Sequence, residues 1–273
     1  MGRRRERRGD TWNAKGDRVV SNAEPTGRMD GGQAEGAATG PVYATLSVIV
    51  PVYNERNTVA EVIRRIRAVD IPLTVDVIVV NDGSSDGTDK VLAAIEDSTV
   101  KVMNHSVNQG KGAAIRTGLA EVRGDLVLIQ DADLEYDPDD WPKLLEPILK
   151  GKARVVYGSR FTGERMNMLP SHWIGNRVLS LVTNVLYSST LSDMETCYKL
   201  FDRKVISGIT IKSDRFDFEP EITAKVLRKG HRIYEVPISY AGREIAEGKK
   251  ITWRDGFGAL KALIKFRFTR LDP

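Results

Sequence analysis

Short apolar runs alternate with segments of helical periodicity from residue 44 onward, and no other feature of the sequence constrains the fold as strongly. The pattern predicts strands at residues 44–53, 73–84, 99–105 and 124–133. It predicts helices at residues 57–69, 85–97, 111–122 and 137–150. Apolar strands that alternate with helices are typical of a parallel sheet covered on both faces. We therefore expect an α/β fold with a mostly parallel central sheet and helices on both faces.

Composition narrows the class of protein. The chain has 273 residues, of which 41% are hydrophobic, enough for one large domain or two small ones. No apolar run approaches the ~18–20 residues of a membrane span, and no signal-peptide pattern is visible. The single cysteine, Cys197, suits a reducing cytoplasm, and we expect it to be a small buried side chain. A net charge of +4 gives no reason to expect nucleic-acid binding.

The sequence divides into three parts. Residues 1–43 are rich in Gly, Ala and charge and lack apolar periodicity, so we expect a disordered, basic, Gly-rich tail. Its arginine cluster is either a contact for anionic lipid or simply solvated. Residues 44–255 are expected to form the folded domain, and residues 256–273 a basic amphipathic helix.

Polar motifs follow the predicted strands. In chain order they are "PVYNE", "NDGSSDGT", "NQGKG" and "DADLE". In open α/β sheets, ligands bind beyond the carboxyl ends of the strands. We therefore expect these charged side chains on one rim: Glu55, Asp82, Lys111, Asp131 and Asp133. No P-loop is present, and the lack of GxGxxG after the first strand counts against a dinucleotide-dependent dehydrogenase.

Three carboxylates, Asp131, Asp133 and Glu135, come directly after the fourth strand. They alternate with Ala132 and Leu134, so an extended chain would direct all three to the same side. Clustered carboxylates raise one another's pKa unless a cation lies among them. Oxygen ligands suit Mg²⁺ or Mn²⁺, whose coordination is usually completed by water and substrate phosphates. The motif therefore predicts a divalent metal that holds a diphosphate.

Seven motifs run in order through nearly all of residues 45–255. They are "VIVPVYNE", "VVNDGSSDGT", "NQGKGAAIRTG", "DADLEYDP", "YGSRF", "SDMETCYKLF" and "YEVPISYAGREIAEGKK". Together they resemble family 2 glycosyltransferases with the GT-A fold, and within that family the dolichol-phosphate mannose synthase group, which glycosylates polyprenyl phosphates. The resemblance implies a nucleotide-diphospho-sugar transferase fold, a UDP- or GDP-sugar donor, a Mg²⁺ or Mn²⁺ cofactor, and inversion at the sugar carbon.

The resemblance also implies a donor site. It predicts that Pro51, Tyr53 and Glu55 line the nucleotide pocket, and that Val80 and Asp82 contact the base. An aromatic ring can stack on a base, and a carboxylate can accept from its N–H edge. The whole expected nucleotide-sugar site is Pro51, Tyr53, Glu55, Val80, Asp82, Lys111, Asp131, Ala132, Asp133, Arg160, Arg243 and Lys249.

Metal and phosphate ligands follow from the same resemblance. Asp131, Ala132 and Asp133 match the DxD motif, and Glu135 is a third metal ligand where the family often has Gln. Arg160, Arg243 and Lys249 match the phosphate-binding cations, with a solvated basic face as the alternative for these three. The residues expected to act in catalysis are Asp133, Asp193, Arg243 and Lys249.

The acceptor determines whether a base is needed. A lipid phosphate has a second pKa of about 6, so it is largely deprotonated at neutral pH and needs no base. A sugar hydroxyl does need one, and Asp193 and Glu195 are then the candidates. A structural or acceptor-positioning role is the alternative for both. No histidine is expected to pair with a carboxylate of these motifs.

Two apolar helices point to the acceptor. Residues 172–190 are expected to form one, and the last residues carry an apolar stripe in a second. The stripe comprises Trp253, Phe257, Leu260, Ile264, Phe268 and Leu271, and is flanked by Arg254, Lys261, Lys265, Arg267 and Arg270. A basic, aromatic amphipathic helix fits a membrane surface, and packing of the stripe on the sheet is the alternative. We expect the protein to be peripheral at the cytoplasmic membrane face or held by a membrane-anchored partner.

The expected function is an inverting, metal-dependent transfer of a sugar from a nucleotide-diphosphate sugar to a polyprenyl phosphate. One alternative acceptor is a hydroxyl of a soluble or cell-envelope glycan. A second alternative is a non-catalytic nucleotide-sugar-binding subunit. A third is a nucleotidyltransferase, although that class usually has a Gly-rich basic loop where this chain has "PVYNERNT".

Overall fold

A computed structural model describes residues 42–243 and 253–270, with side chains of the second range from residue 256 onward. The predicted tail, residues 1–43, lies outside the described residues except for its last two positions. Lys249 also lies outside the described residues.

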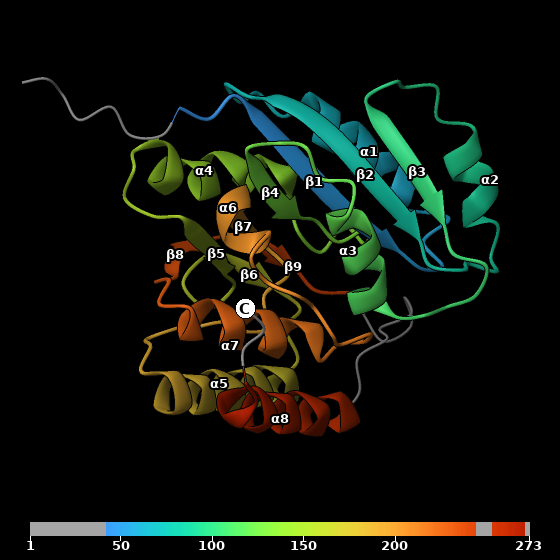
Figure 1. Cartoon of the computed structure of the whole chain (residues 1–273). Helices are drawn as coiled ribbons and strands as arrows, with labels where there is room; N and C mark the ends of the chain where they lie inside the picture. Colours follow the sequence, from blue (N-terminus) through green and yellow to red (C-terminus); the bar gives the residue numbers. More distant parts are fainter. Residues whose placement is uncertain (1–41, 244–252, 271–273) are drawn as a thin grey trace, which may run out of the picture. The chain divides into compact units, whose positions relative to one another are not determined.

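A seven-stranded, mostly parallel sheet forms the centre of the described chain (Figure 1). Its strand order is β3-β2-β1-β4-β7-β5-β8, and β7 runs antiparallel to both of its neighbours. The strands are β1 (Thr45–Val52), β2 (Thr74–Asn81), β3 (Val100–Asn104), β4 (Leu126–Ile129), β5 (Val155–Ser159), β7 (Lys199–Asp202) and β8 (Tyr234–Pro237). Two short strands, β6 (Arg165–Met166) and β9 (Tyr240–Ala241), pair separately.

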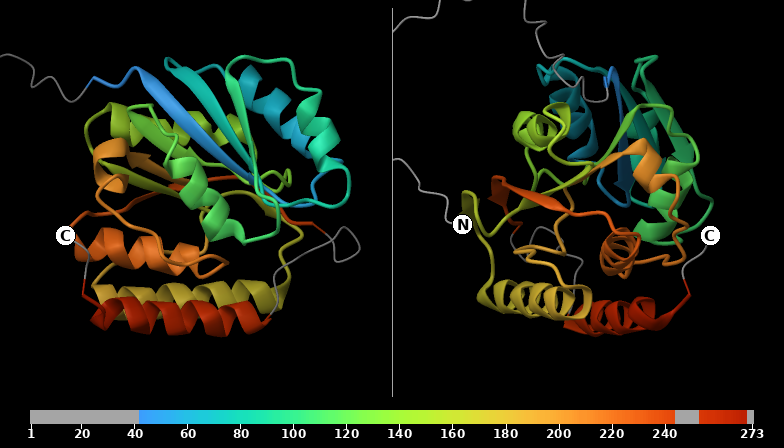
Figure 2. Two further views of the ribbon diagram at one scale, coloured as in Figure 1. Left: turned by 45° about the vertical axis from the view of Figure 1, so that its right-hand side comes forward. Right: turned by 60° about the vertical axis from the view of Figure 1, so that its left-hand side comes forward.

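Helices connect the strands and cover both faces of the sheet. In the two views of Figure 2, α1 and α4 lie on one side, and α3 and α6 on the other. The helices are α1 (Val59–Ala68), α2 (Thr88–Ala93), α3 (Lys111–Leu119), α4 (Trp141–Leu149, after the 3-10 turn Pro138–Asp140), α5 (Pro170–Tyr187), α6 (Arg203–Ile206), α7 (Phe218–Arg228) and α8 (Trp253–Phe268). The predicted alternation of four strands and four helices up to residue 150 is confirmed.

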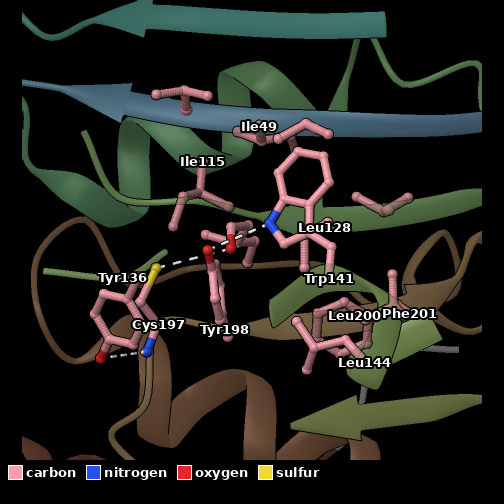
Figure 3. Packing of buried hydrophobic residues seen from close by; sticks show 14 of the residues in the cluster. Ile49, Ile115, Leu128, Tyr136, Trp141, Leu144, Cys197, Tyr198, Leu200 and Phe201 are labelled. Carbon is pink, nitrogen blue, oxygen red and sulfur yellow. Dashed lines mark hydrogen bonds between the residues drawn. The ribbon is translucent and has the colours of Figure 1, made fainter. Parts of the chain in front are cut away.

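The core lies against β1 and β4, directly behind the ends that carry the polar motifs. Figure 3 shows Ile49 and Leu128 packed around the indole of Trp141 and the ring of Tyr198. The Trp141 indole donates to Gln130 Oε1 at 3.2 Å, so its buried N–H is satisfied. This packed interior gives the residues that follow β4 a rigid base.

Helices α5 and α8 lie side by side beyond α7 (Figures 1 and 2). The buried face of α8 consists of Ala259, Ala262, Leu263 and Phe266, which pack on α5 and α7. The predicted apolar stripe is divided: Leu260 packs against this buried face, whereas Phe257, Ile264 and Phe268 are exposed. The alternative that the stripe packs on the sheet is therefore wrong for these described positions. None of the helices within the described ranges has the length and apolar character needed to cross a membrane.

Candidate functional site

The site lies where the strand order changes direction. From β1 the chain goes to β2 and then β3 on one side, after which β4 pairs with the other side of β1. Ile49 of β1 is in register with Ile129 of β4, so the segments after both strands emerge together. Such a switch point is the usual ligand site of open α/β sheets.

The carboxylates after β4 lie on a turn. The strand ends at Ile129, and Leu134 has a φ of 63°, in the left-handed region that side chains rarely adopt. Asp133 Oδ1 closes the turn by accepting the Glu135 N–H at 3.1 Å. The expectation that an extended chain directs three carboxylates to one side is therefore wrong.

Glu135 is hydrogen-bonded to residues 240–243, which follow β8. Its carboxylate accepts the hydroxyl of Tyr240 at 2.7 Å and the N–H of Arg243 at 2.9 Å, and its carbonyl accepts the Ala241 N–H. With both carboxylate oxygens engaged in this way, the geometry argues against Glu135 as a metal ligand. Within the described ranges, no three acidic, His or Cys side chains are grouped to hold a metal.

Two carboxylates nevertheless fit a divalent cation. Burial, followed by the charges of Asp131 and Glu135, raises the pKa of Asp133 to about 8. Such crowding is relieved when a cation lies among the carboxylates. Mg²⁺ is commonly bound through one or two carboxylates with substrate phosphates completing the shell, so Asp131 and Asp133 are sufficient donors.

Asp131 already has a cation against it. The Lys111 ammonium, at the start of α3, lies 3.0 Å from Asp131 Oδ1 and 2.9 Å from Glu219 Oε1. Burial lowers the pKa of Lys111, but the charges of Asp131 and Glu219 outweigh it and keep this pKa well above its ordinary value. Lys111 is thus a permanent positive charge beside the DxD motif.

Arg243 lies on the turn that carries the DxD motif. Its Nε donates to the carbonyl of Asp133 at 2.9 Å, and its two Nη atoms contact the Glu55 carboxylate at 3.2 and 2.7 Å. Glu55 is oriented in turn by the Thr58 hydroxyl at 2.8 Å. The structure thus brings Glu55, Asp133 and Arg243 together. Among the described residues, these contacts use three of the five N–H groups of the guanidinium.

Arg160 and Asp193 form a buried pair. Nε and Nη2 of Arg160 each lie 2.7 Å from an oxygen of Asp193, and the Arg160 backbone N–H donates to the same carboxylate. Asp193 is 0% exposed. This placement argues against Asp193 as a general base, because both of its oxygens are occupied by a cation. Its described role is to orient Arg160, whose guanidinium also lies over the Tyr240 ring.

Glu195 has a different environment from Asp193. Its Oε1 is buried and has no hydrogen-bond partner among the residues that the structure describes. Burial, followed by the charge of Glu219, raises the pKa of Glu195 to about 8, although Lys199 opposes the change. Of the two candidate bases, Glu195 alone keeps an unengaged carboxylate oxygen.

The other residues predicted to bind the donor differ in how much of their surface is exposed. Pro51 is the last but one residue of β1, and Tyr53, which follows the strand, is exposed. Ala132 is buried within the DxD turn. Val80 has no exposed surface, so contact with a base would require its neighbours to move. The contacts predicted for these residues stay predictions.

Asp82 holds the "NQGKG" loop. Its carboxylate accepts the N–H groups of Gln109 at 2.9 Å and Gly110 at 2.7 Å, and it contacts His105 Nδ1 at 2.7 Å. The expectation that no histidine pairs with a carboxylate of the motifs is wrong. Asp82 thus positions the loop that leads into Lys111.

Sequence reasoning missed three residues of the site: His105, Glu219 and Tyr240. His105 and Glu219 lie outside the seven motifs, Tyr240 lies in the last of them without a predicted role, and each contacts its partner from a different element. The signal available for Glu219 was the alternation of three acids, Asp217, Glu219 and Glu221, of which the structure leaves Glu219 only 4% exposed.

Comparison with known proteins places the chain in a family. The model described as "Glycosyl transferase family 2" matches residues 47–210. A dolichyl-phosphate beta-glucosyltransferase of Trichomonas vaginalis is 32% identical over 219 residues, 73% of this chain and 67% of that one. An undecaprenyl-phosphate mannosyltransferase of Micrococcus luteus is 31% identical over 211 residues, 74% of this chain and 85% of that one.

A longer relative matches over part of its length. A low-salt glycan biosynthesis hexosyltransferase of Haloferax volcanii is 30% identical over 233 residues, which are 84% of this chain. The chain spans 55% of the length of that relative.

The fold is also similar to solved structures. Glucosyl-3-phosphoglycerate synthase from Mycobacterium tuberculosis, with Mn²⁺, UDP-glucose and phosphoglyceric acid bound, has a TM-score of 0.65 at 21% identity, over 82% of this chain and 80% of that one. At this identity the likeness concerns the GT-A-like fold alone. Since the family model matches more than half of the sequence, the chain belongs to glycosyl transferase family 2.

Proposed function

We propose that the chain transfers a sugar from a nucleoside-diphosphate sugar to a polyprenyl phosphate at a membrane surface, with inversion at the sugar carbon. One observation carries the proposal: Asp131 and Asp133 lie on one turn at the switch point of the sheet, and the guanidinium of Arg243 is hydrogen-bonded to that turn. This arrangement joins ligands for a divalent cation to a donor for phosphate oxygens. Relatives named for transfer to dolichyl and undecaprenyl phosphates support the choice of acceptor.

On the donor side, Asp131 and Asp133 would hold Mg²⁺ or Mn²⁺. When bound, the metal neutralises negative charge that develops on the leaving diphosphate. Arg243 offers its two remaining N–H groups to the same diphosphate, and its position is fixed by Glu55 and by the Asp133 carbonyl. Lys249 is proposed as a second phosphate contact from outside the described residues.

On the acceptor side, Arg160 would bind the lipid phosphate. Asp193 fixes its guanidinium through Nε and Nη2, which leaves Nη1 for a phosphate oxygen. A phosphate dianion is a sufficient nucleophile at neutral pH, because its second pKa is about 6. The engagement of Asp193 by Arg160 is consistent with a reaction that uses no base at this position.

Exposed apolar side chains on α5 and α8 support a membrane location. On α5, the exposed side chains Ile174, Val178, Leu181 and Val185 recur at helical spacing. On α8, Phe257, Ile264 and Phe268 are exposed, with Lys261, Lys265 and Arg267 exposed beside them. We call this set the α5–α8 surface. Apolar side chains flanked by cations fit the interface of an anionic bilayer. The proposed location is peripheral, at the cytoplasmic membrane face, alone or with a membrane-anchored partner.

Identification of the leaving group tests which class of reaction the chain catalyses. The full chain is incubated with UDP- or GDP-sugar and polyprenyl phosphate, with Mn²⁺ or with EDTA, and the released phosphates are identified. We expect nucleoside diphosphate, with release abolished by EDTA and by Asp133→Asn. The control Asp139→Asn removes an exposed carboxylate from the adjacent turn and should retain release. Pyrophosphate would indicate a nucleotidyltransferase, and nucleotide binding without any release would indicate a non-catalytic subunit.

Glu195 supports a second candidate function, transfer to a sugar hydroxyl. Its unengaged Oε1 and raised pKa, about 8, suit a general base. Glu195→Gln distinguishes the two acceptors, because it should abolish transfer to a hydroxyl and spare transfer to a phosphate. The comparison requires each acceptor to be assayed with the same donor and at the same pH.

A further inference from the structure

Lys111 shares one positive charge between two carboxylates. Its Nζ lies 3.0 and 3.2 Å from the two oxygens of Asp131, and 2.9 Å from Glu219 Oε1. Asp131 belongs to the DxD turn, whereas Glu219 lies in the first turn of α7. The ammonium therefore occupies the carboxylate that a divalent cation would need.

The backbone on both sides of Lys111 is closely packed, whereas its side chain ends between the two carboxylates. Gly110 has a φ of 104°, and a Cβ there would meet the Asp214 carbonyl oxygen at 2.3 Å. A Cβ on Gly112 would meet the carbonyl oxygen of Ser213 at 2.4 Å. The two glycines of "GKG" thus allow the start of α3 to press against residues 213–214.

One carboxylate oxygen of Glu219 is not used by its contact with Lys111. Its Oε2 is buried and has no hydrogen-bond partner among the described residues, while Oε1 contacts Lys111. The other buried lysine nearby, Lys199, donates instead to the carbonyls of Met194 and Thr196. An unsatisfied buried carboxylate oxygen is costly, so a second contact with an ammonium would be favourable.

We infer that Lys111 is a resident counter-ion of the DxD motif, and that Glu219 receives its ammonium when a divalent cation takes Asp131. The inference rests on the metal site of the proposed function. A divalent ion and an ammonium on the same carboxylate repel each other, so the ammonium must leave as the metal binds. Glu219 provides a destination within reach of the same side chain, because Lys111 already contacts its Oε1.

Substitutions of Glu219 and of Lys111 should change the metal affinity in opposite directions. Without the charge of Glu219, Lys111 has Asp131 alone as its anionic partner and competes more strongly with the metal. Without the charge of Lys111, Asp131 has no resident cation and binds the metal more tightly. A merely structural role for the pair would instead weaken metal binding in both variants.

The test measures Mn²⁺ binding by the full chain, with and without UDP. The electron paramagnetic resonance signal of free Mn²⁺ reports how much of the ion is bound. Glu219→Gln is expected to raise the Kd by about tenfold, the effect of one charge-assisted contact. Lys111→Met is expected to lower the Kd, and Asp131→Asn to abolish binding. Glu121→Gln is the matched control, since it removes a carboxylate that pairs with Lys101. Circular dichroism and melting temperature establish that each variant is folded.

The outcomes separate this inference from the proposed function. An unchanged Kd in Glu219→Gln, or weaker binding in both variants, overturns the inference and leaves the metal site intact. If the wild-type chain shows no Asp131-dependent binding of Mn²⁺, alone or with UDP, the metal site itself is wrong and the inference falls with it. In Lys111→Met/Glu219→Gln, the inference predicts a smaller effect of the Glu219 change than in the wild-type background.

Discussion

Ion pairs between distant segments fix the cations of the site. Arg243 pairs with Glu55, and Arg160 with Asp193. A guanidinium held by part of its donors keeps its direction while it presents the remaining N–H groups. Removal of Asp193 leaves the charge of Arg160 buried and without this partner, which costs about 3–5 kcal/mol. Substitution of Asp193 should therefore change stability as well as activity.

Asp193→Asn tests whether this carboxylate positions Arg160 or acts as a base. We expect the variant to lose both transfer activity and melting temperature, because Arg160 loses a buried anionic partner. Arg160→Met/Asp193→Asn should be less destabilised than the sum of the single variants. Asp214→Asn, from an exposed Asp–Arg pair, is the control and should change neither quantity. Loss of transfer at an unchanged melting temperature would contradict the positioning role.

Glu195 predicts a pH dependence of stability. The folded chain keeps the proton of Glu195 up to a pKa of about 8, whereas the unfolded chain loses it near 4.5. Between these pH values the unfolded state binds fewer protons, so the free energy of unfolding falls as pH rises. Glu219 and Asp193 raise this pKa, and Lys199 and Arg160 lower it. Denaturant titrations should show that the free energy of unfolding falls less with rising pH in Glu195→Gln than in the wild type. The same pH dependence in both proteins would contradict the raised pKa of Glu195.

The convergence of the motif residues was predictable, and their pairing was not. The rule for strand ends brought Glu55, Lys111, Asp131 and Asp133 to one rim, as the structure confirms. The turn after β4 escaped prediction because Leu134 adopts a positive φ that no residue type there indicates. Glu219 escaped because its partner lies in a distant helix.

Secondary-structure elements follow from local periodicity, and strand order does not. The eight elements from β1 to α4 lie where the apolar pattern predicts them. The position of β7 between β4 and β5, antiparallel to both, depends on contacts between segments far apart in the chain. A four-residue strand also carries too little sequence pattern to show its direction.

The α5–α8 surface predicts membrane binding. Leu181→Ser/Val185→Ser/Phe268→Ser removes three exposed apolar side chains and should weaken binding to anionic liposomes at every salt concentration. Lys261→Glu/Lys265→Glu should weaken binding mainly at low salt, since each cation contributes about 1 kcal/mol near an anionic surface. Liposome co-sedimentation measures both effects.

Val107→Ser provides the matched control for the apolar substitutions. Val107 is as exposed as the α5 side chains but lies in the loop after β3. This variant should bind liposomes like the wild type. Equal losses in the control and in the triple variant would mean that the α5–α8 surface has no special part in binding.

Across the whole described chain, the residues of the proposed donor site and the exposed apolar side chains belong to different elements. The sheet edge at β1 and β4 carries the carboxylates and Arg243, while α5 and α8 carry the exposed apolar side chains. Arg160 and Asp193 flank the α5 helix in sequence, since they follow β5 and precede β7. This order is suited to a reaction in which a water-soluble donor meets a phosphate presented by a lipid.

The product of transfer tests the proposed reaction most directly. Radiolabelled UDP- and GDP-sugars are incubated with the full chain, Mn²⁺ and a short-chain polyprenyl phosphate, and the label is followed into the organic extract. We predict a mild-acid-labile sugar monophosphate lipid of inverted anomeric configuration, absent with EDTA. Label that reaches only water-soluble acceptors, while the polyprenyl phosphate remains unmodified, would contradict the lipid acceptor.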